Sequence, residues 1–201
     1  DGYTLLVASL STHAVAPSLY GKLPYDPLKD FAHLTEIVSI PNAVSVHPSV
    51  PARTVKELVA LAKARPGQLN YASNGSGTSN HLATELFKTR AGIQIFHVPY
   101  KGSAPAMIDL LGGHVSMMLD VVMTSQPHIK SGKIRGIAVT GLNRSAVLPE
   151  LPTVAESGYP GFEAMVWLGY FGPAGLPKEL AARLNADAVS VLNSPKMKAV
   201  L

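Results

Sequence analysis

Short apolar runs alternate along the chain with longer stretches in which apolar residues recur every three or four positions. The short runs are typical of buried strands and the longer stretches of amphipathic helices. Strands are predicted at residues 3–8, 31–38, 43–46, 69–72, 93–98, 115–119 and 134–140, with a mainly extended segment at 162–171. Helices are predicted at residues 54–65, 79–90, 103–111 and 125–131, with a last helix that holds Pro177 in its first turn.

Local residue patterns mark where some of these elements begin. Thr54 with Glu57 and Thr153 with Glu156 have the spacing of a capping box, which opens many helices. Pro41 lies between the second and third predicted strands.

The alternation of strands and helices between residues 43 and 140 predicts βαβ units, and therefore an α/β fold with a parallel sheet and right-handed crossovers. In such sheets ligands bind beyond the carboxyl ends of the strands, near the N-termini of the helices. The loops in that position are residues 9–13, 73–79, 100–103 and 120–125.

The composition narrows the class of protein. The chain has 201 residues, of which 47% are hydrophobic and 15% charged. The charged share lies below the roughly 25% of an average domain, which excludes a disordered chain and a coiled coil. The sequence contains no run of about 18 apolar residues, so it predicts no membrane-spanning helix. Residues 1–3 lack the features of a secretory signal. Because cysteine is absent, the chain holds neither disulfides nor thiolate metal ligands.

The formal net charge is +4, but the Lys and Arg residues are scattered. Nucleic-acid binding usually requires a basic stripe with interleaved aromatic residues, and none is present, so no nucleic-acid partner is expected. A mild positive potential instead favours small anionic ligands.

The most informative loop is rich in glycine and small hydroxyl residues, lies after a predicted strand and opens a predicted helix. It comprises Ser73, Asn74, Gly75, Ser76, Gly77, Thr78 and Ser79. Glycine lets backbone amides turn toward a ligand, and the helix N-terminus adds partial positive charge. This pattern predicts a site for an anion such as a carboxylate. The alternative is a tight turn in which Ser or Thr only caps the helix.

A second loop of the same kind holds Tyr100, Lys101, Gly102 and Ser103. Lys101 is a candidate to attract a carboxylate and the amides at Gly102 and Ser103 to bind it, unless Lys101 is only a surface residue beside a helix cap. Asp120 ends an otherwise apolar strand. It either accepts a hydrogen bond from a ligand hydroxyl or amine, or caps the following turn.

Other chemistries fit the sequence poorly. Asn80 stands where a dinucleotide-binding fingerprint requires glycine, and the order Lys101-Gly102-Ser103 is wrong for a phosphate-binding P-loop. The seven histidines show no metal-binding spacing, so no metal or cofactor is expected. His13 and His81 are interpreted as hydrogen-bonding structural residues. No set of nucleophile, base and acid emerges, so no catalytic residue is proposed.

Several segments, taken in order, form one recognisable pattern. They are Asp1–Leu6, Pro24–Pro27 with Asp30-Phe31, Tyr71–Ser73 with Gly75 and Gly77-Thr78, His97–Gly102, Asp109–Gly113, Pro152–Glu156, Gly158–Glu163 and Pro173–Gly175. This pattern resembles the Bug family, the extracytoplasmic solute receptors of tripartite tricarboxylate transporters. The resemblance covers essentially the whole chain and rests on the order and spacing of the segments rather than on one motif.

The resemblance implies a two-lobed, type II-like periplasmic binding protein that closes on a small ligand. Each lobe is expected to be a mostly parallel sheet flanked by helices. Residues 1–42 and 166–201 are expected to belong to lobe 1, and residues 43–165 to form lobe 2. Because members of the family are longer, lobe 1 is expected to be incomplete and to lack one jaw of the binding site.

The resemblance also implies function. It suggests a monomeric periplasmic receptor that captures a small carboxylate in an interlobe cleft and delivers it to a membrane permease. The ligand-binding positions carried over are Ser9 and Ser11 in lobe 1, and in lobe 2 residues 73–79, residues 100–103 and Asp120. Two alternatives stay open: a sensory protein that signals to another partner, and an enzyme acting on a carboxylate or acyl substrate. A nucleophile and base within hydrogen-bond reach would favour the enzyme.

Overall fold

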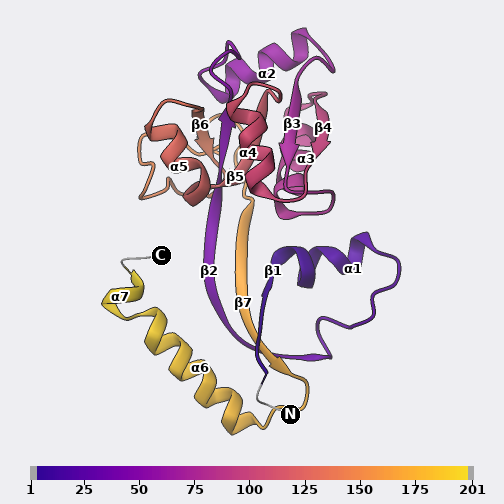
Figure 1. Ribbon diagram of the computed structural model, residues 1–201, viewed down its shortest axis with the longest axis vertical. Helices are drawn as coiled ribbons and strands as arrows, with labels where there is room; N and C mark the ends of the chain where they lie inside the picture. Colours follow the sequence, from indigo (N-terminus) through magenta and orange to yellow (C-terminus); the bar gives the residue numbers. More distant parts are fainter. Residues whose placement is uncertain (1–3, 199–201) are drawn as a thin grey trace. The chain divides into compact units, whose positions relative to one another are not determined.

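The computed structural model describes residues 4–198, and the chain divides into two compact units. Unit 1 comprises residues 1–39 and 166–201, and unit 2 comprises residues 40–165. Two strands run from one unit into the other, namely β2 (Phe31–Val46) and β7 (Met165–Pro173). Both are long ribbons in Figure 1.

Unit 2 is built from short strands that alternate with helices (Figure 1). Besides part of β2, its strands are β3 (Asn70–Ser73), β4 (Phe96–Pro99), β5 (Met117–Val121) and β6 (Arg135–Val139). Its helices are α2 (Val55–Ala64), α3 (Ser79–Ala91), α4 (Ser103–Leu111) and α5 (Val122–Lys130). The predicted α/β class is confirmed, and each predicted helix of this unit begins within three residues of the observed one.

The sheet of unit 2 is mixed. Strand β3 lies between β4 and β5 and is parallel to both. Strand β2 pairs antiparallel with β5 on one side and with β6 on the other. Strands β5 and β6 therefore run in the same direction, as the predicted βαβ unit requires, but β2 is inserted between them. The hydrophobic pattern reports burial and not pairing order, so it does not reveal an inserted strand.

Helices cover both faces of this sheet. Tyr71 on β3 and Met117 on β5 pack in one apolar cluster with Leu58 of α2 and Phe87 of α3. The next residues along the same strands, Ala72 and Met118, pack in a second cluster with Leu110 of α4. Successive side chains of a strand point to opposite faces, so the unit has three layers with the sheet in the middle.

Two strand predictions are wrong in detail. The strands expected on either side of Pro41 form one continuous strand, β2, whose pairing with β5 begins at Asn42, just after the proline. The strand expected at residues 93–98 begins only at Phe96. Ile93 and Ile95 are buried in the core but belong to no strand, so their apolar character reflects packing alone.

Two predictions about local turns also need correction. The polar loop predicted at residues 9–13 contains part of a π-helical turn, Ser11–Val15, which continues into α1 (Ala16–Leu19). Thr153 and Glu156 make both hydrogen bonds of a capping box, at 2.7 and 2.9 Å, but they close a turn and not a helix. Gly158 follows at once with a φ of 105°, which ends any helical path.

In unit 1, β1 (Leu6–Ser9) pairs antiparallel with β7, and this pairing differs from the parallel arrangement expected for each lobe. Tyr3, the first residue of the predicted strand, lies outside the described residues. The ring of His13 packs 4.4 Å from that of Phe171 between centroids. The unit also contains α6 (Lys178–Leu192) and α7 (Pro195–Lys198). Pro177 lies at the N-cap position, one residue before the first turn of α6 in which it was predicted, and makes no side-chain capping hydrogen bond. Among residues 4–198, no helix is both long and apolar enough to cross a bilayer.

Candidate functional site

The candidate site lies at one edge of the sheet of unit 2. Strands β3, β4 and β5 are parallel, so their carboxyl ends meet at the same edge. Each strand is joined to the next helix by five residues or fewer, β3 to α3, β4 to α4 and β5 to α5. The N-terminus of a helix carries partial positive charge and unpaired N–H groups. This edge therefore collects three helix N-termini and three of the four predicted loops.

The glycine-rich loop between β3 and α3 is fixed by its own residues. Gly75 has a φ of 134°, and a Cβ atom there would lie 3.3 Å from the carbonyl oxygen of Tyr100, so the position favours glycine. The Gly75 N–H donates to Oγ of the buried Ser73 at 3.2 Å. Thr78 caps α3, donating to the Gly75 carbonyl at 2.7 Å and accepting from the His81 N–H at 3.4 Å. The capping alternative thus applies to the Thr78 hydroxyl.

The second loop is hydrogen-bonded to the first. The Tyr100 N–H donates to the Ser73 carbonyl at 3.0 Å, and the Gly102 N–H donates to the Asn74 carbonyl at 3.1 Å. The residue that caps α4 is Gly102, with a φ of 120°, and not Ser103. Since glycine has no side chain, the first-turn amides of α4 receive no cap from it. Lys101 is exposed at the tip of this loop.

Tyr100 is turned toward the body of α4. Its hydroxyl donates to a carboxylate oxygen of Asp109 at 2.5 Å. Burial, together with the hydrogen bond and the charge of Asp109, raises the pKa of Tyr100 to about 12. The phenol thus stays protonated and anchors the second loop to the helix that follows it.

Asp120, near the end of β5, is the buried centre of the edge. Asp120 is only 1% exposed. One carboxylate oxygen accepts from Asn80 Nδ2 at 3.0 Å and from Asn74 Nδ2 at 3.4 Å. The other accepts from Ser103 Oγ and from Thr124 Oγ1, the latter at 2.9 Å. These four bonds use the acceptor capacity of a carboxylate, so one side chain ties together the starts of α3, α4 and α5.

Asn80 is a further polar residue of this edge that the loop patterns did not predict. Besides Asp120, its Nδ2 atom reaches the Leu119 carbonyl at 3.0 Å and Asn42 Oδ1 at 3.2 Å. Asn42 in turn donates to the Ala164 carbonyl at 3.1 Å. The signal in the sequence that could have identified Asn80 is its position along the predicted helix. Asn80 lies seven residues before the buried Phe87 on one face of α3, and a polar residue on a buried face needs partners there.

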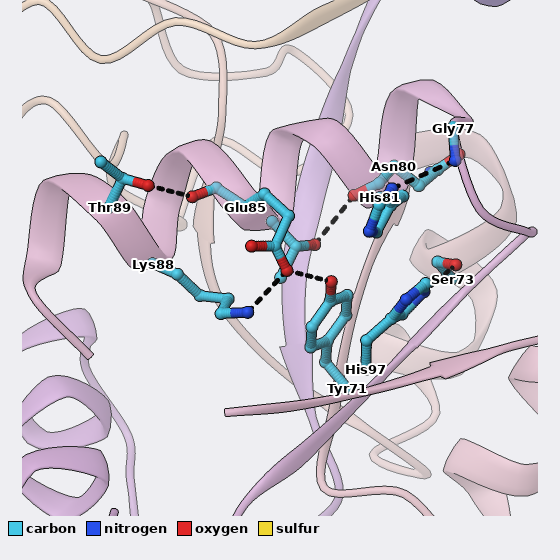
Figure 2. A network of polar contacts seen from close by, with 10 residues as sticks. Tyr71, Ser73, Gly77, Asn80, His81, Glu85, Lys88, Thr89 and His97 are labelled. Atoms are coloured by element: carbon cyan, nitrogen blue, oxygen red, sulfur yellow. Dashed lines mark hydrogen bonds and ion pairs between the residues drawn. The ribbon is translucent and has the colours of Figure 1, made fainter. Parts of the chain in front are cut away.

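Beside the loop, three rings form a stack (Figure 2). The Tyr71 and His97 centroids lie 4.8 Å apart, and those of His97 and His81 lie 4.2 Å apart. Glu85 accepts from the Tyr71 hydroxyl at 2.5 Å and from Lys88 Nζ at 2.6 Å. Burial and Glu85 raise the pKa of Tyr71 above its usual range. Burial and the charge of His81 lower the pKa of His97. His81 Nδ1 also accepts from the Gly77 N–H at 3.1 Å, as its interpretation as a hydrogen-bonding residue predicts.

One serine and histidine of this group are close enough to be a nucleophile and a base. Ser73 Oγ lies 2.7 Å from His97 Nε2. However, Ser73 is fully buried. Its Oγ atom also accepts from the Gly75 N–H and lies within donating distance of the Gly75 carbonyl, both at 3.2 Å. A nucleophile must reach its substrate, so this pair holds the loop and does not offer a reactive hydroxyl.

The remaining predicted positions are more scattered. Ser76 is exposed at the loop tip, whereas Gly77 and Ser79 are buried. Ser9 and Ser11 belong to unit 1. Among the described residues, no three acidic or histidine side chains gather closely enough to hold a metal ion.

Two buried polar atoms near this edge have no hydrogen-bond partner among the described residues. They are Asn74 Oδ1 in the glycine-rich loop and Ser125 Oγ in α5. Buried polar groups normally find partners in protein, ligand or ordered water.

The fold and this edge together define an α/β ligand-binding protein of the two-lobed, periplasmic-binding-protein kind. Comparison with known proteins gives the family. A family model described as the tripartite tricarboxylate transporter family receptor matches residues 1–201. The chain belongs to this family, and the predicted resemblance to Bug receptors is confirmed by its relatives.

The relatives include proteins of known structure. The chain is 38% identical to the protein BugT of Bordetella pertussis over 195 residues, which are 96% of this chain and 60% of BugT. A structure of an R. palustris protein with adipate has a TM-score of 0.93 and 39% identity, covering 100% of this chain and 67% of that one. The protein MatC from Rhodopseudomonas palustris, with bound malate, has a TM-score of 0.87 and 30% identity, covering 98% and 67%. The chain spans less than two thirds of the length of the curated relatives it matches first, 60% in the case of BugT.

Proposed function

We propose that the chain belongs to a periplasmic receptor that captures a small carboxylate and delivers it to a membrane permease, without chemical change of the ligand. The observation that carries the proposal is the gathering of three helix N-termini at one sheet edge. The loops at this edge have glycine at positions of positive φ, and α4 has no side-chain cap. Such an edge offers backbone donors and partial positive charge to an anion.

The division of donors at the edge supports a carboxylate ligand. Asp120 is a buried anionic group, and by itself it would repel a second carboxylate. All four of its partners are side-chain donors, so its charge is compensated within the protein. The backbone amides at the start of α4 are not used in this compensation. We assign Asp120 the role of a positioning residue. We assign direct contact with the ligand to the two loops at residues 73–79 and 100–103, through those donors that the protein does not itself engage, such as the uncapped first turn of α4.

The remaining assignments extend this site. Lys101 is exposed on the second loop and would attract an anion through its charge. We propose that units 1 and 2 correspond to the two lobes of the receptor. The family resemblance then implies that Ser9 and Ser11 contribute from lobe 1.

The structural neighbours suggest which carboxylates to test first. One neighbour was solved with adipate and another with malate, and both ligands carry two carboxylates. We therefore propose small dicarboxylates as the first ligand class to test.

The test is a thermal-shift screen of the receptor in its natural length against adipate, malate, monocarboxylates and the neutral diamide of adipate. At a concentration of 100 Kd, a ligand adds about 2.7 kcal/mol of stability, which is a clear rise in Tm. We expect a rise with at least one acid and none with the diamide. A folded protein that responds to no acid, or equally to the diamide, would contradict the proposal.

A further inference from the structure

The glycine-rich loop is held from one side by two histidine rings that the proposed binding site does not itself use. The Gly77 N–H donates to His81 Nδ1 at 3.1 Å. His97 Nε2 lies 2.7 Å from Ser73 Oγ, at the other end of the same loop. The two rings are stacked at 4.2 Å between centroids and tilted by only 20° (Figure 2). The stack thus contacts both ends of the loop.

The hydrogen bond at Gly77 sets the protonation state of His81. A backbone N–H only donates, so Nδ1 must carry a lone pair and the ring must be neutral, with its proton on Nε2. A proton added at Nδ1 would place two donors face to face 3.1 Å apart. The bond would break and the Gly77 amide would be released.

The surroundings of the stack determine how it titrates. The titratable and charged groups that face the two rings are Tyr71 on β3 and Glu85 and Lys88 on α3. Glu85 is already engaged by Lys88 and by the Tyr71 hydroxyl, so its charge is largely compensated. A proton on either imidazole repels a proton on the other, because the rings lie in contact. Burial and His81 accordingly lower the pKa of His97.

We propose that His81, supported by the stacked ring of His97, is a positioning residue that holds the glycine-rich loop in its ligand-binding shape only while the His81 ring is neutral. Protonation of His81 on acidification then releases Gly77 and weakens binding at this edge. The inference rests on the proposed function, since it assumes that the loop contacts the ligand. The clamp itself is a property of the protein without ligand.

Three variants separate the parts of this inference. In His81→Asn, the side-chain oxygen can accept from Gly77 and takes up no proton, so the loop stays fixed at both ends of the pH range. In His81→Phe, the ring stack is kept but the acceptor is lost. His114→Asn is the control, because His114 is exposed in the turn after α4, away from the loop.

The experiment measures adipate affinity of the natural-length receptor by calorimetry between pH 5.5 and 7.5. We expect the affinity of the wild type and of His114→Asn to fall about tenfold more than that of His81→Asn, the effect of one lost hydrogen bond. Protonation of adipate affects every protein equally and cancels in this comparison. His81→Phe should bind about tenfold more weakly even at pH 7.5. Equal pH profiles for wild type and His81→Asn would overturn the proposal.

A second measurement needs no ligand. In ¹H–¹⁵N spectra of the ligand-free receptor, the Gly77 amide should titrate together with the His81 ring in the wild type, and should stay constant in His81→Asn. If no carboxylate binds to any variant, the proposed function fails while this titration still decides on the clamp. A Gly77 amide that is unaffected by pH in the wild type would overturn it.

Discussion

The buried carboxylate of Asp120 offers the sharpest test of how the candidate site is built. Replacing Asp120 with Ala removes the acceptor shared by Asn74, Asn80, Ser103 and Thr124. Replacing it with Asn keeps the shape and one oxygen. The Asn80 and Asn74 amides can still donate to that oxygen, and the two hydroxyls can turn to accept from the new amide group.

The contacts around Asp120 set the expected magnitude. Each neutral buried donor that is left without an acceptor costs about 1–3 kcal/mol. Because most of the donors around Asp120 keep another acceptor, the total stays near the cost of one stranded donor. Asn74 keeps Asn80 Oδ1 at 2.9 Å, Asn80 keeps the Leu119 carbonyl at 3.0 Å, and Thr124 keeps the Val121 carbonyl at 2.9 Å. We expect about 3 kcal/mol for Asp120→Ala and about 1 kcal/mol for Asp120→Asn, the value of one neutral hydrogen bond.

The assay is urea unfolding of the natural-length receptor, with adipate affinity measured on the same samples. Leu58→Ala is the matched control, because Leu58 is fully buried in α2, which contributes no residue to the edge, and its truncation costs about 2–5 kcal/mol. Asp120→Ala should lose affinity because the starts of α3, α4 and α5 are no longer tied together, whereas Leu58→Ala should keep it. A cost below about 1 kcal/mol for Asp120→Ala, or equal costs for the Ala and Asn variants, would refute the reasoning.

Two further predictions concern the loop glycines and the charged group beside the stack. Gly102→Ala and Gly158→Ala place a Cβ at a φ of 120° and 105° with no atom within 4 Å, so both should lose about 1–3 kcal/mol in urea unfolding. Only Gly102→Ala should weaken adipate binding in calorimetry, and an equal effect of both would remove the second loop from the site. Although burial raises it, hydrogen bonds from Lys88 and Tyr71 leave the pKa of Glu85 below its usual value. Glu85 therefore stabilises the fold above its unfolded pKa and loses this effect as pH falls through the lower folded value, so Glu85→Gln should flatten the stability profile below about pH 4.5. If the free energy of unfolding, measured with urea at acidic pH, fell equally in Glu85→Gln and in the wild type, this prediction would be wrong.

The sequence predicted those parts of the fold that depend on neighbouring residues. Helix α4 begins and ends where the pattern places it, at Ser103 and Leu111, because a glycine precedes the helix and Gly112 follows it. Helix α2 begins after Thr54, whose hydroxyl accepts from the Glu57 N–H at 3.1 Å as a capping box requires. The loops of the candidate edge were found for the same reason, since each directly joins a strand to a helix.

The sequence could not predict contacts between distant segments. Asp120 meets Asn74 and Asn80, which lie 46 and 40 residues earlier in the chain, and neither contact leaves a local signature. The insertion of β2 between β5 and β6 depends on sheet pairing, which hydrophobic periodicity does not encode. The ring stack has the same origin, because Tyr71, His81 and His97 come from β3, α3 and β4.

A buried anion at the centre of the proposed anion-binding edge would be a difficulty only if Asp120 and the ligand competed for the same donors. Asp120 is held by the side chains of Asn74, Asn80, Ser103 and Thr124 and by no backbone amide among its described contacts. Asp120 therefore takes up no backbone donor of the helix N-termini, and the first turn of α4, which has no side-chain cap, keeps its donors and partial positive charge for the proposed ligand. Because the four side chains come from three successive strand–helix connections, the internal carboxylate also fixes the spacing of those connections. The carboxylate whose negative charge would repel a ligand at close range thus arranges the donors that we propose bind it.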